Sequence, residues 1–224
     1  MKDYSLTKSK YIVGLQCEKA LYMDSYHRER AYYSPETLAL FKRGRLFESQ
    51  VKETFAPAVD ISSMRGMSFG KYPAITSELL SLPTTHALYE AGFLYDRVLV
   101  LADVVVRHTD GSLDVYEIKN SLQPTETFRH DIAIQYYVIA HSGHVINSFH
   151  LIHNDGNDQP VLVDMTAVAQ EEQAAVAFHL AHFKEVLNGL EPVVEPGAHC
   201  HTPYACAFLR YCHATSTLAP KDSL

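Results

Sequence analysis

The chain has 224 residues, of which 47% are hydrophobic, so it can bury a sizeable core within one domain. Apolar runs such as residues 98–106 are too short to span a bilayer, and Met1–Tyr4 has no apolar signal region, so we expect a cytoplasmic protein without a membrane partner. The formal net charge of −7 argues against a general attraction to nucleic acid.

The charge is unevenly distributed along the chain. Residues 1–52 contain ten basic and six acidic side chains, a balance of +4, so the remaining 172 residues carry −11. This basic N-terminal part is typical of a solvated helical face of mixed charge, and it is equally typical of a surface that faces DNA. The sequence leaves both interpretations open.

The first predicted elements are helices. The segment Ser5–Ser9 offers N-cap residues for one helix, and Ser34–Thr37 opens a second, with proline near its first turn, that continues through Val51. Residues 56–85 are rich in Ser, Pro and Gly, and we expect them to be irregular.

From Ala87 the hydrophobic pattern changes to the period of strands. Three strands are predicted first, then a helix that stops at Gly143, two more strands and a long helix. Their ranges are 87–93, 97–107 and 113–119, helix 128–141, strands 146–153 and 161–164, and helix 166–188. This order predicts an α/β or α+β fold in which helices flank one central mixed sheet.

The turn between the second and third strands decides how two acidic residues are paired. A two-residue turn at Asp110–Gly111 would set Asp103 opposite Ile118. A three-residue loop, with Gly111 in the left-handed position of a bulge, sets Asp103 opposite Glu117 instead. Only the second register places both carboxylates on one face of the sheet.

This register would also bring an amine to the same face, because Glu117 and Lys119 are two positions apart on one strand. Carboxylates that share a divalent cation no longer repel one another, and oxygen-only ligands suit Mg²⁺ or Mn²⁺. We therefore expect metal ligands at Asp103 and Glu117, with the backbone carbonyl of Ile118 as a third oxygen. Lys119 would position a water or neutralise charge on a phosphate that is being hydrolysed. A surface strand with an ordinary salt bridge remains the alternative.

Two further segments carry polar residues that could join this group. Gly44–Glu48 places Glu48 on the second predicted helix, and Asp131–Gln135 places two polar side chains on one face of the helix after the hairpin. The order of a helix acid, an aspartate, Glu-x-Lys and a helix with glutamine resembles the PD-(D/E)XK nuclease superfamily, in its RecB-like branch. One cysteine before this core and three after it resemble the iron-sulfur subset of that branch.

That subset includes the CRISPR adaptation exonuclease and AddB-type nucleases, and the chain is most similar to a bacterial domain family of unknown function within it. The segments that carry this likeness are Thr7–Lys19, Leu88–Ala91, Tyr116–Ser121, Asp131–Tyr137 and Gly197–Cys212. Relatives often have histidine in place of Glu48 and a tyrosine four positions after the glutamine, where this chain has Ile139. Asn120 also stands where a small hydroxyl residue is expected.

The resemblance implies a restriction-endonuclease-like α/β core, with a central mixed sheet flanked by helices and with N- and C-terminal segments joined by a cysteine cluster. It implies a single domain over 1–224, made of a helical part (1–55), a nuclease core (86–165) and a cysteine segment (195–214). The catalytic residues implied are Asp103, Glu117, Lys119, Glu48 and Gln135.

The cysteines suggest a second cofactor. The C-terminal spacing is Cys-x5-Cys-x5-Cys, unlike the paired knuckles of common zinc sites. Four thiolates suit Zn²⁺ or an iron-sulfur cluster, and the resemblance favours a 4Fe-4S cluster with a mainly structural role. The implied ligands are Cys17, Cys200, Cys206 and Cys212, although an ordinary buried thiol is the alternative for Cys17.

The sequence therefore predicts a DNA nuclease that requires Mg²⁺ or Mn²⁺ and acts on single strands or duplex ends. The alternative is a catalytically inactive nucleic-acid-binding or assembly module with a structural Fe-S or Zn site, and a zinc-stabilised protein without a nucleic-acid role is a third possibility. The chain has no P-loop, so an unwinding helicase, or a recombination or defence partner, would be a separate protein.

Overall fold

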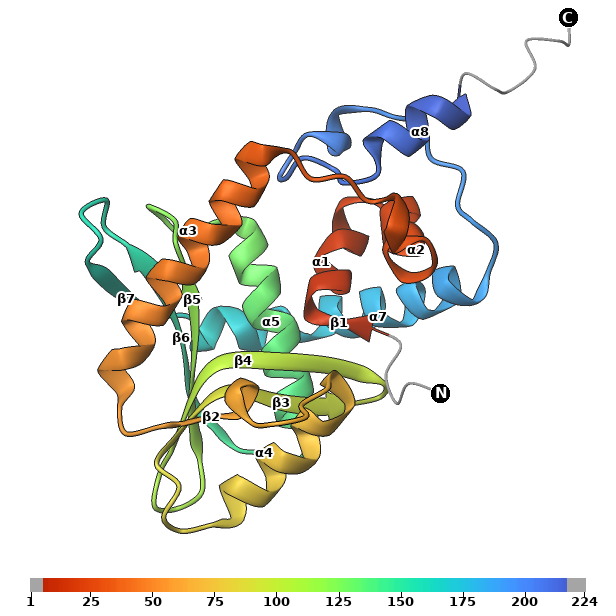
Figure 1. Ribbon diagram of the computed structural model, residues 1–224. Helices are drawn as coiled ribbons and strands as arrows, with labels where there is room; N and C mark the ends of the chain where they lie inside the picture. The colour runs from red at the N-terminus through yellow and green to blue at the C-terminus, as the bar shows by residue number, and fades with distance from the viewer. Residues whose placement is uncertain (1–5, 217–224) are drawn as a thin grey trace, which may run out of the picture.

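The computed structural model describes residues 6–216 and has a mixed sheet at its centre (Figure 1). The sheet has seven strands: six follow the order β2-β3-β4-β5-β6-β7, and β1 pairs with β4. The strands are β1 (Leu6–Thr7), β2 (Val59–Asp60), β3 (Ala87–Tyr95), β4 (Val98–Arg107), β5 (Leu113–Lys119), β6 (Ile146–Asn154) and β7 (Pro160–Asp164). The structure thus confirms the central mixed sheet flanked by helices.

Helices cover both faces of this sheet. The helix α3 crosses one face, where Phe47 and Val51 pack against Val104, Ile118 and Ile152. The larger core lies on the other face and includes buried residues from α1, α2 and from α4 to α7. The α-helices are α1 (Lys8–Gln16), α2 (Glu18–Tyr26), α3 (Pro35–Lys52), α4 (Tyr72–Ser81), α5 (Glu126–His141), α6 (Thr166–Glu171), α7 (Gln173–Asn188) and α8 (Leu209–Ser216).

The predicted N-terminal helices begin at capped residues. The Thr7 side chain accepts a hydrogen bond from the backbone N–H of Lys10, and Ser34 accepts one from that of Thr37, with Pro35 in the first turn. Ser5, the other end of the predicted capping segment, lies outside the described residues. The sequence signals at these two helix starts are therefore confirmed.

The hairpin between β4 and β5 has the three-residue loop. Arg107 pairs with Leu113 and Val104 with Tyr116, and Gly111 adopts a φ of 88°. Extended by one residue, this register sets Asp103 opposite Glu117, so the alternative pairing of Asp103 with Ile118 is wrong. Glycine is favoured at this bulge because it has no Cβ that would clash with the backbone at a left-handed φ.

The expectation that residues 56–85 are irregular is wrong. The segment contains β2, short 3₁₀ turns and the ten-residue helix α4. The helix is stabilised from outside the segment: Leu80 packs into the larger core, and the buried Thr76 hydroxyl accepts a hydrogen bond from Gly92 N–H at 2.8 Å. A Cβ at Gly92 would clash with Tyr72, so α4 lies directly on β3. Tertiary packing overrides the weak local pattern.

The predicted helix 166–188 is divided in two at Glu172. The short helix α6 packs against α5 and β6, whereas α7 packs against α1, α2 and α5. The hydrophobic stripe keeps one period through α6 and α7, so the sequence does not reveal where the first helix ends. The two helices differ in the elements against which they pack.

The C-terminal segment returns to the N-terminal helices. Gln16 on α1 donates hydrogen bonds to the carbonyls of His199 (2.6 Å) and Tyr204 (2.7 Å), and Tyr32 N–H donates to Ala207. In Figure 1, α8 lies beside α2, where Tyr211 packs against the cluster of Ala20 and Met23. Among the residues that the structure describes, no helix is both long and apolar enough for a bilayer crossing.

Candidate active site

Two strand ends meet along one edge of β4. β1 lies parallel to β4 at Val98 and Leu99, and β5 lies antiparallel to it from Val104 onward, both on the edge opposite β3. Their carboxyl ends therefore point toward each other. Lys8 directly follows β1, and β5 ends on the Glu117-Ile-Lys sequence. Carboxyl ends of strands at a change of strand order are common ligand sites in α/β folds.

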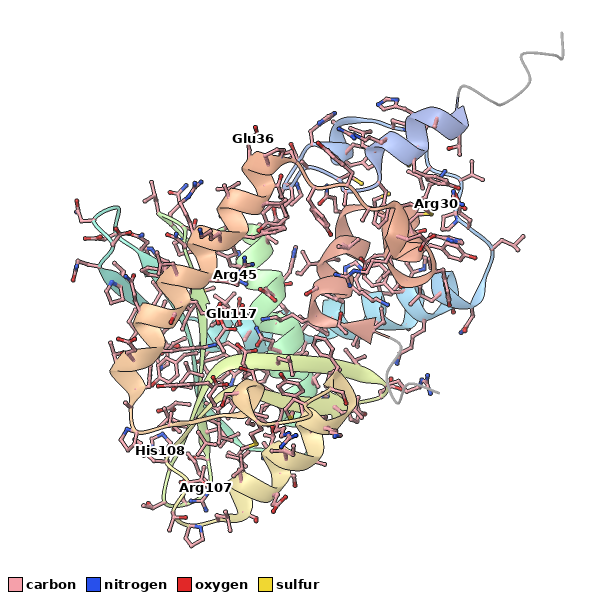
Figure 2. All side chains as sticks on the ribbon, in the orientation of Figure 1. Arg30, Glu36, Arg45, Arg107, His108 and Glu117 are labelled. Atoms are coloured by element: carbon pink, nitrogen blue, oxygen red, sulfur yellow. The ribbon has the colours of Figure 1, made fainter. Side chains whose placement is uncertain are left out.

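Glu117 is the most enclosed charged residue of this region. It is 1% exposed, and Figure 2 shows it between α3 and α5. Lys8 Nζ lies 2.9 Å from both carboxylate oxygens, Lys119 Nζ lies 2.5 Å from Oε1, and Gln135 Nε2 donates to Oε2 at 2.8 Å. Burial alone would raise the pKa of Glu117, but the ammonium groups of Lys119 and Lys8 outweigh it and hold this pKa well below its usual range.

Asp131 on α5 completes this charged group. Lys119 Nζ lies 2.6 Å from its carboxylate and Lys8 Nζ 3.7 Å. Burial raises the pKa of Asp131. Burial opposes the charged form of Lys119, but Asp131 and Glu117 raise its pKa well above the usual value. Two acids and two amines thus neutralise one another, and we call Lys8, Glu117, Lys119 and Asp131 the buried quartet.

Asp103 connects the buried quartet to a second acidic group. Its Oδ2 accepts a hydrogen bond from Ile118 N–H at 2.8 Å, which fixes the carboxylate beside the end of β5. Burial, followed by the negative charge of Glu117, raises the pKa of Asp103 well above its usual range. The β4–β5 register thus sets Asp103 opposite Glu117 as predicted, while their sharing of one metal ion stays a prediction.

The second group, which we call the acidic triad, consists of Glu48, Glu90 and Asp103. One oxygen from each lies within 4.8 Å of the others, and no other group of three His, Cys, Asp or Glu residues meets that limit in the described chain. Lys52 Nζ lies 2.5 Å from Glu48 Oε1 and 2.6 Å from Glu90 Oε1. Carboxylate oxygens at this spacing suit a hard divalent cation such as Mg²⁺ or Mn²⁺.

Glu90 reaches the triad through an unusual backbone conformation. Glu90 lies opposite Asp103 in the β3–β4 register. Its φ is +55°, in the left-handed region that residues other than glycine rarely adopt. Leu88 and Ala91 both belong to the larger core although they are an odd number of positions apart. The strand alternation is thus interrupted at Glu90, and such conformations cluster at functional sites.

Two buried oxygens of the site lack donors among the described residues. These are Asp131 Oδ1, which lies 3.7 Å from Lys8 Nζ without a hydrogen bond, and Gln135 Oε1, and both residues are at least 94% buried. An unpaired buried acceptor is costly, so these atoms fit a place where water or a ligand completes the network. The donor set of carboxylates and an amide likewise fits a hydrated divalent cation.

The structure gathers all five predicted catalytic residues in two adjoining groups. Glu117, Lys119 and Gln135 meet in and beside the buried quartet, whereas Glu48 and Asp103 meet in the acidic triad. The ligand set predicted from sequence, Asp103, Glu117 and the Ile118 carbonyl, stays a prediction. Sequence reasoning assigned no role to four charged residues of the site, Lys8, Lys52, Glu90 and Asp131, although it named Asp131 with Gln135 on one helix face.

Different signals could have found these residues. Lys8, Glu90 and Asp131 lie in segments that carry the family resemblance, and Asp131 is one turn before Gln135. Lys52 is one turn after Glu48, which is the spacing of a helical ion pair. No sequence pattern shows that Lys8, 109 positions from Glu117, lies beside it.

The cysteines form a separate region. All four are free, and Cys17 and Cys206 pack with Ala20, Met23 and Phe208 where the N-terminal helices meet the C-terminal segment. Burial raises the pKa of Cys206, and the other three thiols raise it further. No three of the sulfurs lie within 4.8 Å of one another, whereas a tetrahedral zinc site holds its sulfurs about 3.8 Å apart. The predicted cysteine cluster therefore stays a prediction.

Comparison with known proteins adds little to this geometry. No protein-family model matches the chain, and no curated protein matches it. One solved structure, described as the crystal structure of SSO0001, is similar over 76% of this chain and 75% of that chain, with 11% sequence identity and a TM-score of 0.41.

Proposed function

We propose that this protein is a metal-dependent deoxyribonuclease of the PD-(D/E)XK type, with a restriction-endonuclease-like core. The observation that carries the proposal is the meeting of Asp103, Glu117 and Lys119 at the facing ends of β1 and β5, next to Glu48 and Gln135. Two groups of carboxylates beside a partly buried amine match the demands of phosphodiester hydrolysis, which needs a bound cation and a neutralising charge.

The acidic residues would hold Mg²⁺ or Mn²⁺. Asp103 is the shared member, because it belongs to the triad and also lies beside Glu117. Bound there, the ion would polarise a phosphate and lower the pKa of a water molecule. Glu48 and Glu90 are each about a quarter exposed, whereas Glu117 is 1% exposed, so substrate would enter from the side of the triad.

Other side chains of the site orient these groups. Lys119 Nζ is held by Glu117 and Asp131, from which it can place a water or stabilise negative charge that develops on the phosphate. Gln135 fixes the orientation of Glu117 through its amide. Lys8 also pairs with Glu117 and Asp131. Lys119 is therefore not the only amine that balances these two carboxylates.

The surface of α3 supports DNA as the substrate. Lys42, Arg43 and Arg45 are exposed on this helix, and Phe41 is 46% exposed beside Tyr33. Basic groups can follow a phosphate backbone, and exposed rings can stack on unpaired bases, so this helix fits single strands or frayed duplex ends.

We further propose a structural 4Fe-4S cluster at Cys17, Cys200, Cys206 and Cys212. A four-iron cluster takes one thiolate per iron and so holds its thiolates farther apart than one zinc ion does. Such a cluster would join α1 and α2 to the C-terminal segment that Gln16 already contacts. Anaerobic purification should give a brown protein that absorbs in the visible range. A colourless protein that contains one equivalent of zinc would favour the zinc alternative.

The decisive experiment is digestion of end-labelled single- and double-stranded DNA with Mg²⁺ or Mn²⁺. We expect degradation by the wild type and at least a hundredfold slower degradation by Lys119→Met, a loss typical for one electrostatic contact to a transition state. Lys184→Met, which removes an amine that pairs with Asp96 on the outer helix α7, controls for the lost charge. DNA binding without digestion under either ion would support the catalytically inactive binding module instead.

A further inference from the structure

Lys52 contacts two of the three carboxylates of the acidic triad. It is the last residue of α3, one turn after Glu48, and its ammonium lies 2.5 Å from Glu48 and 2.6 Å from Glu90. Its side chain is 14% exposed. The backbone of this residue is fixed, because the hydroxyl of Tyr89 donates a hydrogen bond to its carbonyl. Only the flexible part of the side chain is therefore free to move.

A divalent cation and this ammonium cannot share the triad. Mg²⁺ takes carboxylate oxygens at about 2.0–2.1 Å, and an ammonium held at 2.5 Å by the same oxygens would lie within the repulsive range of the ion. The two cations would compete for Glu48 and Glu90. The ammonium must leave for the metal to take both carboxylates.

The charges indicate where the ammonium would go. Three carboxylates carry a formal charge of −3, and a divalent cation reduces it to −1. A phosphodiester that binds the ion adds a further negative charge on the exposed side of the triad. The displaced ammonium of Lys52, still attached to the end of α3 within one side-chain length, is the cation placed to balance it.

We propose that Lys52 exchanges partners during binding: its ammonium fills the acidic triad in the metal-free protein, leaves when a divalent cation enters, and then contacts a phosphate of the substrate. The inference rests on the proposed function, because it takes the triad as the metal site. It adds a substrate-binding residue and explains why the metal-free triad is stable although three carboxylates meet there.

The first test measures Mn²⁺ binding without DNA, from the electron paramagnetic resonance signal of free Mn²⁺. We expect Lys52→Met to bind Mn²⁺ about tenfold more tightly than the wild type, because the competing ammonium is gone; that factor corresponds to about 1.4 kcal/mol. Lys52→Arg keeps the charge and should bind as the wild type does. Lys42→Met removes the same charge from the exposed part of α3 and should change the affinity less than twofold.

The second test measures turnover of a labelled single-stranded oligonucleotide at saturating Mn²⁺. We expect Lys52→Met to raise KM at least fivefold with a smaller change in kcat, because a contact to a substrate phosphate is lost. Lys52→Arg should largely restore KM. A thermal melt of each variant shows whether it is folded.

The outcomes separate this inference from the proposed function. If the wild type binds no Mn²⁺, the proposed metal site itself is refuted. If the wild type binds Mn²⁺ but Lys52→Met binds it no more tightly, or Lys42→Met gains as much, Lys52 does not compete with the ion. If Mn²⁺ binding tightens but KM is unchanged, the contact to phosphate is refuted.

Discussion

The buried quartet predicts a large and pH-dependent loss of stability on replacing Lys8 by methionine. Methionine keeps the length of the side chain but removes an ammonium that lies 2.9 Å from both oxygens of Glu117 and 3.7 Å from Asp131. The variant leaves two buried carboxylates with one amine, Lys119, between them. Their mutual repulsion is no longer balanced.

The magnitude follows from what remains. Removing one partner of an isolated buried ion pair costs about 3–5 kcal/mol. Here Lys119 and Gln135 still contact Glu117, so we expect a smaller loss in the free energy of unfolding, about 2–3 kcal/mol. For a chain of this length each kcal/mol lowers Tm by about 2–4 °C, so Tm should fall by about 4–12 °C.

The sign of the pH dependence comes from Glu117. Its folded-state pKa is held below its unfolded value of about 4.3, so its contribution to stability is present above that pH and is lost as the pH falls toward the folded pKa. Without Lys8 this depression is smaller. The stability difference between wild type and variant should therefore be full at pH 7 and shrink below about pH 4.

Urea denaturation followed by circular dichroism between pH 3 and pH 7 measures this difference. Lys42→Met, at an exposed position of α3, is the control and should change stability by less than about 0.5 kcal/mol. The reasoning fails if the Lys8 variant is as stable as the control. It also fails if its deficit is the same at pH 3 as at pH 7.

Three further predictions test other parts of the structure. Glu90→Asn should weaken Mn²⁺ binding at least tenfold but cost under about 1 kcal/mol in urea denaturation, because asparagine tolerates the left-handed φ of +55° but lacks the charge and one methylene of glutamate; unchanged Mn²⁺ affinity would remove Glu90 from the metal site. Gln16→Ala should speed the reaction of the metal-free protein with a thiol reagent at least threefold, because Cys200, now 4% exposed, loses the two hydrogen bonds that hold its segment; an unchanged rate would contradict this anchoring role. Gly92→Ala should lower stability by about 2–4 kcal/mol, because its Cβ would overlap Tyr72 on α4, and a wild-type Tm would show that α4 can move away freely.

The sequence predicted the parts of this fold that depend on local or paired patterns. The turn at Thr109–Gly111 decided the register of Asp103 and Glu117, because loop length and a left-handed glycine leave one pairing. Capping residues likewise located the starts of α1 and α3. These signals lie within a few residues of the structure that they determine.

Features that depend on distant packing were missed. The helix α4 is stabilised by Thr76 and Leu80 against β3 and the larger core, and nothing in its own Ser-rich sequence required it. Lys8 joins the site only because β1 pairs with β4, a two-residue contact too short to be read from a pattern. The left-handed conformation of Glu90 breaks the alternation on which strand predictions depend.

The large sequence separation between contacting residues affects how the protein folds during synthesis. Lys8 and Glu117 are 109 positions apart, and Gln16 and His199 are 183 apart. During synthesis these contacts can form only after Glu117, and later His199, have left the ribosome. Many distant contacts of this kind slow folding, so we expect the newly made protein to depend on chaperones that shield its first fifty residues.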